Sequence, residues 1–190
     1  MERKKFIKRF LALGGGAIAV VSGVKVYQVF KSPDLSFLKN AQPLIDELAE
    51  MIIPSTDTPG AKEAGAGEFV SFMVRESCSQ ATQNRFIDGL RDLAAYSILE
   101  YKKPYQKCSL SEKRAILSHF EKKSFFYKGI VAKAEHKLLG DPFFITLKKY
   151  TVLGYCSSEL GATRAFNYDP VPHEYMNTLL EPGQKAWATQ

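Results

Sequence analysis

Helical periodicity constrains the fold of this chain more than any other feature of its sequence. After residue 31, large apolar residues recur three and four positions apart along successive stretches, and no alternating apolar–polar run is long enough to predict a strand. Pro54 and Pro104 end two of these stretches, and Gly140-Asp141-Pro142 separates the last two. The sequence therefore predicts an all-α, helical-bundle-like single domain.

Each expected helix has one apolar face, and the connections between helices are short. The expected helices carry their apolar residues over Leu44–Ile52, Phe69–Val74, Phe86–Ile98, Ile116–Phe120 and Phe143–Tyr155, and a further helix is expected from about Phe125 to Leu139. Ser109 and Glu112 have the spacing of a capping box at the start of the fourth helix. Lys31–Asp34 is expected to be a linker, and the chain from Gly161 onward an extended tail.

The first thirty residues are typical of an export segment, with a basic start and an uncharged apolar stretch from Phe10 to Val24. Within the basic start, a short motif resembles the twin-arginine signal, with Lys in place of the second arginine; it comprises Arg3, Lys4, Phe6, Ile7 and Lys8. A general secretory signal or a basic helix on a membrane surface is the alternative. We therefore expect residues 1–31 to be a signal or anchor and residues 32–190 to be the helical domain.

Charge is distributed unevenly between these two parts. The chain has a net charge of +6, and its first 31 residues hold seven of the 26 basic and one of the 20 acidic residues. From residue 32 onward, 19 basic residues balance 19 acidic ones. A domain without a positive field does not release counterions from phosphates, which argues against a nucleic-acid partner.

No residue pattern predicts a catalytic, cofactor-binding or metal site in this chain. The histidines lie on separate elements without metal-ligand spacing, and Gly154–Glu159 lacks the nucleophile-elbow pattern. The acidic residues of the first helix are expected on its solvated face; they are Asp46, Glu47 and Glu50. An enzyme that uses Cys156 or His173 remains an alternative hypothesis.

Three cysteines, at positions 78, 108 and 156, have no spacing typical of metal ligands. In an oxidising compartment an odd number leaves one thiol either free or paired with another chain. Aromatic residues are concentrated in the C-terminal half of the chain. More large rings than a small core can hold would favour a partner interface.

Four stretches together resemble the gluconate 2-dehydrogenase subunit 3 family. Leu44–Ala61 is similar to the family's opening signature, which ends in "IPaTDtPGA", and Ala64–Val70 to the "aGv…Fv" that follows it. Phe143–Ala162 resembles "FF..L…t..GYyTSe.Ga", and Tyr168–Tyr175 resembles "Y.PvPg.y". Cys156 stands where the family usually has an aromatic residue, and His173 where Gly is common.

The resemblance implies an accessory subunit of a periplasmic, membrane-associated dehydrogenase complex. In such complexes a large flavoprotein of the glucose-methanol-choline type holds FAD and oxidises a sugar or sugar acid, and a cytochrome c subunit often accepts the electrons. The small subunit holds no cofactor and carries the export signal with which the flavoprotein travels. A stand-alone, membrane-anchored domain that binds a small ligand is the alternative.

The proline- and glycine-rich stretch from Pro54 to Ala61 is expected to lie at the partner interface. Prolines and glycine restrict its backbone to one shape, which suits recognition, although a tight connection between helices would need the same residues. The full set of interface candidates is Pro54, Thr56, Asp57, Pro59, Gly60, Tyr155, Cys156, Tyr168, Pro170 and Pro172.

Overall fold

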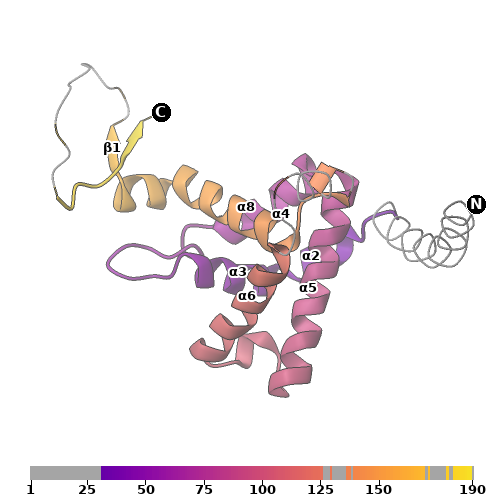
Figure 1. Cartoon of the computed structure of the whole chain (residues 1–190). Helices are drawn as coiled ribbons and strands as arrows, with labels where there is room; N and C mark the ends of the chain where they lie inside the picture. Colours follow the sequence, from indigo (N-terminus) through magenta and orange to yellow (C-terminus); the bar gives the residue numbers. More distant parts are fainter. Residues whose placement is uncertain are drawn as a thin grey trace, which may run out of the picture.

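The computed structural model describes residues 31–125, 129, 136–137, 139–169, 171, 179 and 182–189. This part of the chain is mostly helical, as predicted (Figure 1). The α-helices are α2 (Leu35–Asn40), α3 (Gln42–Ile52), α4 (Ala66–Ser77), α5 (Gln80–Tyr101), α6 (Leu110–Ser124) and α8 (Phe143–Ser157). The shorter elements are the 3₁₀ turn η1 (Tyr105–Lys107), the π-helical turn η2 (Gly161–Ala165), and the strands β1 (Asn167–Asp169) and β2 (Trp187–Thr189). The export segment and most of the helix expected from 125 to 139 lie outside the described residues.

One core joins α3, α4, α5, α6 and α8. Leu48, Val70, Leu90, Ile116 and Leu147, one from each of these helices, are fully buried. The stripe predicted on the last helix, Phe143 to Tyr155, is buried along its whole length. Because α8 contacts the other four helices, it is the central element of the fold (Figure 1).

Close approach of α5 to α8 depends on Gly89. A Cβ atom at this position would overlap the Cβ and ring of Phe143. Phe143 in turn packs against Phe86 and Phe120, with ring centroids 5.3 Å and 6.0 Å apart. The absence of a side chain at position 89 therefore lets three aromatic rings from α5, α6 and α8 meet.

The predicted apolar face of α5 is confirmed except at its end. Phe86, Ile87, Leu90 and Leu93 are buried, whereas Ile98 is 55% exposed. The prediction that Ile98 belongs to the buried face was wrong. Apolar residues can keep their helical spacing up to the end of a helix whether or not a neighbouring element covers its last turn. That last turn ends at Tyr101, where Lys102 adopts a left-handed conformation with φ 57°.

The capping box at the start of α6 is confirmed. The Glu112 backbone N–H donates to Ser109 Oγ (3.4 Å), and the Ser109 backbone N–H donates to Glu112 Oε2 (2.6 Å). The same carboxylate binds Lys103 Nζ at 2.9 Å. The lysine and the Ser109 N–H lower the pKa of Glu112 to about 2.

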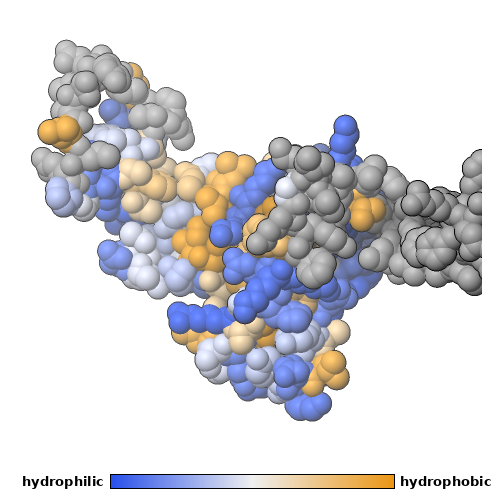
Figure 2. Space-filling model, in the orientation of Figure 1, coloured by the Kyte–Doolittle hydropathy of each residue, from blue (hydrophilic) through white to orange (hydrophobic). Residues whose placement is uncertain are grey.

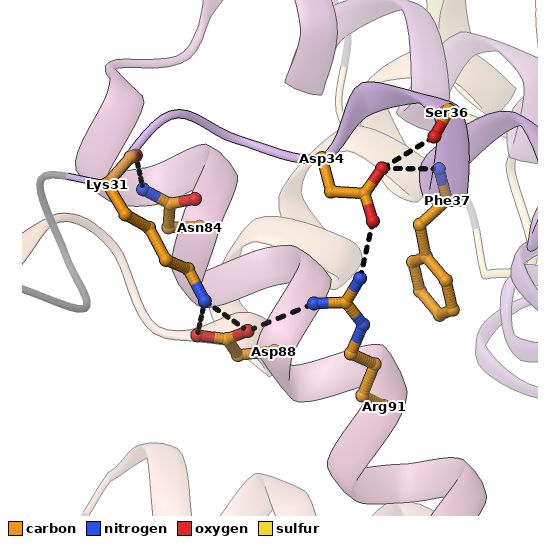
Figure 3. A network of polar contacts seen from close by, with 7 residues as sticks. All are labelled: Lys31, Asp34, Ser36, Phe37, Asn84, Asp88 and Arg91. Carbon is orange, nitrogen blue, oxygen red and sulfur yellow. Dashed lines mark hydrogen bonds and ion pairs between the residues drawn. The ribbon is translucent and has the colours of Figure 1, made fainter.

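The segment expected to be a linker is instead fixed to α5 (Figure 3). The Lys31 carbonyl accepts hydrogen bonds from Asn84 Nδ2 (2.6 Å) and Gln80 Nε2 (3.0 Å), and its ammonium binds Asp88 (3.2 Å). Residues 80, 84 and 88 are spaced one helical turn apart, so Lys31 lies along a polar stripe of α5. Composition alone did not reveal this, because the partners are distant in sequence.

Asp34 continues the same attachment. Its Oδ1 accepts the Phe37 backbone N–H (3.1 Å) and caps α2, while its Oδ2 accepts from Arg91 of α5 (2.7 Å). The Arg91 guanidinium also lies 4.4 Å from the centre of the Phe37 ring (Figure 3). We refer to these contacts of residues 31–37 with α5 as the N-terminal clamp.

The C-terminal tail is more ordered than predicted. After α8 the chain forms η2, and then β1 pairs in parallel with β2 through Asn167 and Trp187, Tyr168 and Ala188, and Asp169 and Thr189. Three residues per strand are too few for an alternating pattern to be recognised, so this pair of strands was not predicted. Within the described residues, no helix is both long and apolar enough to cross a bilayer.

Replacing Gly89 by Leu should lower the free energy of unfolding by about 3 kcal/mol, because the new side chain displaces Phe143 from the core. Urea unfolding measures this change. Ala95→Leu, at an exposed position of the same helix, is the control and should change stability by less than about 0.5 kcal/mol. Equal stabilities for the two variants would contradict the close packing of α5 on α8.

Glu112 should make stability depend on pH in the acid range. Its pKa is about 2 in the folded chain and close to 4.5 when unfolded, so its contribution is complete above pH 4.5 and is lost as the pH falls toward 2. Glu112→Gln should remove this part of the pH dependence, as measured by urea midpoints between pH 2 and 7. Glu121→Gln, on the same helix, is the control, and an unchanged pH profile in Glu112→Gln would refute the assignment.

Candidate functional site

The loop between α3 and α4 is fastened at both ends by one carboxylate. Glu50, in the last turns of α3, accepts the Ser55 backbone N–H at Oε1 (2.8 Å) and the Lys62 backbone N–H at Oε2 (2.9 Å). Two charge-assisted hydrogen bonds from positions seven residues apart hold the 54–61 loop in one shape. The sequence placed Glu50 on a solvated helix face. Its side chain is only partly buried, but the sequence did not predict that the loop folds back onto this carboxylate.

Gly60 is required by this arrangement. The Glu50 carboxylate occupies the space where a Cβ atom at position 60 would lie. Gly60 itself is buried, and the Ala61 backbone N–H donates to the Ile53 carbonyl (2.9 Å). The Pro-Gly-Ala end of the loop is therefore part of the packed interior rather than of its surface.

Tyr155 of α8 contacts the inner side of the 54–61 loop. Its hydroxyl donates to the Pro59 carbonyl at 2.8 Å, and only 5% of its surface is exposed. Its ring forms a small second core with Ala49, Ala61 and Ala66. The small side chains of these alanines leave room for one large ring, so α8 and the loop are joined by both an apolar contact and a hydrogen bond.

Glycines at the C-terminal end of α8 allow equally close contacts. A Cβ atom at Gly154 would lie 2.8 Å from Phe69 of α4, and one at Gly161 would overlap the Tyr155 carbonyl. Ser158 Oγ donates to the same carbonyl (2.8 Å) and accepts the Gly161 backbone N–H (3.0 Å). The chain can therefore turn tightly into η2 beside the loop.

Behind the loop, Glu47 joins two further elements to α3. Its carboxylate binds Lys62 Nζ at 2.8 Å and Lys113 Nζ of α6 at 2.7 Å. Hydrogen bonds from Lys113 and then Lys62 lower the pKa of Glu47. Glu47 was also expected on a solvated face, but it is an internal ion-pair partner.

The outer side of the loop is exposed and polar. Pro54, Thr56 and Asp57 face solvent, whereas Pro59 is half-buried. Thr56 Oγ1 donates to the Asp57 carboxylate (2.9 Å), and the Thr56 backbone N–H donates to the Thr58 carbonyl (3.0 Å). These bonds keep the tip of the loop in a defined conformation while its side chains remain accessible.

A cleft of about 630 Å³ lies between the loop, η2 and the segment before β2. Lys185 Nζ donates to the Arg164 carbonyl (2.9 Å), which joins two sides of it. Its lining carries hydroxyl groups and charges of both signs and comprises Ser55, Thr56, Asp57, Thr58, Pro59, Glu63, Leu160, Thr163, Arg164 and Lys185. We call this the loop cleft.

The structure brings most of the predicted interface residues together and divides them into two groups. Gly60 and Tyr155 are buried and hold the loop in place, while Pro54, Thr56 and Asp57 form its surface. Cys156 follows Tyr155 and is half-buried, and Tyr168 of β1 is 40% exposed. Pro170 and Pro172 lie outside the described residues.

Sequence reasoning missed the residues of the cleft that come from other elements. Glu63, Arg164 and Lys185 line it, although only the 54–61 loop carried a recognisable composition signal. Glu50 was the missed residue with a readable signal, because an acid just before a proline-rich loop can accept that loop's free backbone N–H groups.

The groups considered for catalysis are dispersed. Within residues 31–125 and the other described positions, no three side chains of the metal-ligating types form a cluster. His119 stacks on Tyr96 with ring centroids 4.5 Å apart, His136 Nδ1 lies 3.5 Å from Asp141, and His173 is outside the described residues. All three cysteines are free thiols, and the Cys78 thiol lies 3.5 Å from the Tyr150 hydroxyl.

Comparison with known proteins gives one positive result. No curated protein and no solved structure matches the chain significantly. Residues 39–173, which are more than two thirds of the chain, match the family described as gluconate 2-dehydrogenase subunit 3. This match includes α3 and α8, and also the 54–61 loop and η2, which form two of the three sides of the loop cleft. The chain therefore belongs to the gluconate 2-dehydrogenase subunit 3 family, the small subunits of dehydrogenase complexes.

Proposed function

We propose that this chain is the non-catalytic small subunit of a periplasmic dehydrogenase complex, and that it escorts the large subunit during folding and export. The large subunit is a flavoprotein of the glucose-methanol-choline type, which binds FAD and the substrate. A cytochrome c subunit is the expected acceptor of the electrons. The family match supports the association with a dehydrogenase, and the export segment in residues 1–31 supports the escort role.

The proposal rests on one observation about the 54–61 loop: some residues fix its conformation from inside, and others form its accessible surface. Glu50 and Tyr155 fix the loop from inside, while Pro54, Thr56 and Asp57 have accessible side chains that contribute nothing to the core. A loop that is already held in one conformation loses little entropy when a partner binds it. This arrangement is suited to recognition of another protein.

The loop cleft extends this surface with complementary charges. Asp57 and Glu63 contribute negative charge, and Arg164 and Lys185 positive charge. Charges of both signs on the rim of an interface set the register of two partners and disfavour wrong ones more than they raise affinity. We propose that a segment of the flavoprotein enters the cleft.

Asp57→Arg should weaken co-purification of the large subunit at least tenfold, because it reverses the charge at the tip of the loop without touching the core. The measurement is a pull-down of the tagged chain from its native membrane fraction, with flavin absorbance reporting bound FAD. Asp92→Arg makes the same exchange on α5, where the side chain is 61% exposed, and should leave the yield unchanged.

Two outcomes of that pull-down would count against the proposal. Equal recovery with Asp57→Arg would show that the loop is not the docking surface. Recovery of neither flavin nor a large subunit with the unaltered chain would remove the escort function. It would leave the alternative, a membrane-anchored domain that binds a small polar ligand, for which the loop cleft is the available site.

Replacing both Arg3 and Lys4 by Gln should stop the flavoprotein, together with this chain, from reaching the periplasm. These residues occupy the paired basic positions of the twin-arginine-like motif. The escort proposal requires that the flavoprotein has no signal of its own. Fractionation of cells followed by a flavin and activity assay measures this. Lys5→Gln is the control, because the twin-arginine motif accepts any residue at this neighbouring position. Normal export of the flavoprotein by the double variant would disprove the escort role.

A further inference from the structure

The end of the molecule where α5 gives way to α6 exposes three large aliphatic side chains. Ile98 is 55% exposed, Leu99 70% and Leu110 57%. We call residues 98–114 the α5–α6 corner. In Figure 1 it is the lower end of α5 and α6, and Figure 2 shows hydrophobic and strongly hydrophilic atoms side by side there.

The corner is a rigid unit. Only 1% of the surface of Tyr105 in η1 is exposed; η1 contacts α5 and α3, and Lys113 Nζ of α6 lies 5.8 Å from the centre of the Tyr105 ring. The ion pair between Lys103 and Glu112 joins the end of α5 to the first turn of α6 at 2.9 Å. The end of α5, which carries Leu99, and the start of α6, which carries Leu110, are therefore joined.

Positive charge surrounds these aliphatic side chains. The corner holds five basic and two acidic residues, an excess of three positive charges, although residues 32–190 as a whole hold equal numbers of basic and acidic residues. Lys103 and Lys113 are paired with Glu112 and Glu47. In the described part of the chain, the remaining cations are exposed and form no ion pair; they are Lys102, Lys107 and Arg114.

Lys102 occupies a backbone position that is unfavourable for lysine. Its φ of 57° lies in the left-handed region, which glycine adopts without strain and which most often holds Gly or Asn at the end of a helix. Its backbone N–H donates to the Ile98 carbonyl, a bond that any residue but proline could make. The Lys102 ammonium donates to the Leu99 carbonyl at 2.9 Å, which holds an exposed positive charge beside Leu99.

We propose that the α5–α6 corner binds the surface of an anionic lipid bilayer. Ile98, Leu99 and Leu110 would enter the boundary between headgroups and acyl chains, and the unpaired cations would bind lipid phosphates. Exposed aliphatic residues would match the apolar component of such a surface, and exposed cations that form no ion pair would match its negative component. This inference does not depend on the identity of the large subunit.

The N-terminal clamp places the other end of α5 near the membrane as well. Six residues separate Val24, the end of the apolar stretch, from Lys31, and they span at most about 20 Å. Lys31 is fixed beside Asn84 and Asp88, near the start of a helix of 22 residues that is about 33 Å long. With the N-terminal segment in the bilayer, a helix lying along the surface brings the corner to the same membrane.

A single tryptophan can report whether the corner enters lipid. Trp187→Phe removes the one tryptophan of the chain, and Leu99→Trp then introduces a reporter in the corner. The full-length chain is reconstituted in vesicles of phosphatidylglycerol and phosphatidylcholine with brominated acyl chains, which quench a tryptophan at the acyl boundary. The matched reporter is Phe72→Trp, a half-exposed position on α4. We expect quenching and a blue shift at position 99 and neither at position 72.

Charge variants test whether the basic residues of the corner contribute to its binding of anionic lipid. Lys102→Gly relieves the left-handed residue and should therefore keep the melting temperature, yet it should shift the bound–free equilibrium of the corner about fivefold toward the free form. Lys107→Gln should have a similar effect, and vesicles of phosphatidylcholine alone should abolish the quenching at position 99.

Three results would overturn the proposal. Absence of quenching at position 99 would show that the corner does not touch lipid, and equal quenching at positions 99 and 72 would show that the chain has no preferred face. Protection of position 99 from an aqueous quencher in the purified dehydrogenase complex, without lipid quenching, would assign the corner to a protein partner instead.

Discussion

The packing of α8 is the constraint on which the rest of this structure depends. Gly89 of α5 lets Phe143 reach the centre of the core, and Gly154 of α8 accommodates Phe69 of α4. With these two close approaches α8 contacts four other helices. Because α8 is packed against other helices near both of its ends, its direction is fixed. Its last turns therefore lie against the loop that follows α3.

That support connects the core to the surface through a short chain of contacts. Tyr155, at the end of α8, binds the Pro59 carbonyl, and Glu50 of α3 binds the two ends of the same loop. The residues of the family signature therefore have two different roles. Gly60 and Tyr155 determine the conformation of the loop, and Thr56 and Asp57 display groups that a partner can read.

The sequence predicted the features that depend on local periodicity. It did not predict contacts between residues that lie far apart in the chain. The apolar stripe of α8 and the Ser109–Glu112 capping box follow from spacings of three and four residues, and both are present. The contacts of Glu50 with the loop and of Lys31 with α5 were not predicted, because neither the returning loop nor the stripe on α5 is visible in local composition. The β1–β2 pair was missed because its strands are too short to show a pattern.

The two proposed surfaces involve different elements, and this separation has a functional consequence. The loop cleft is built by the 54–61 loop, η2 and the segment near Lys185, whereas the corner is built by α5, η1 and α6. Contacts at one therefore do not block the other. The core between them, with α8 at its centre, fixes their relative positions, so on the two proposals a flavoprotein bound at the loop cleft would be held at a defined orientation to a membrane bound at the corner.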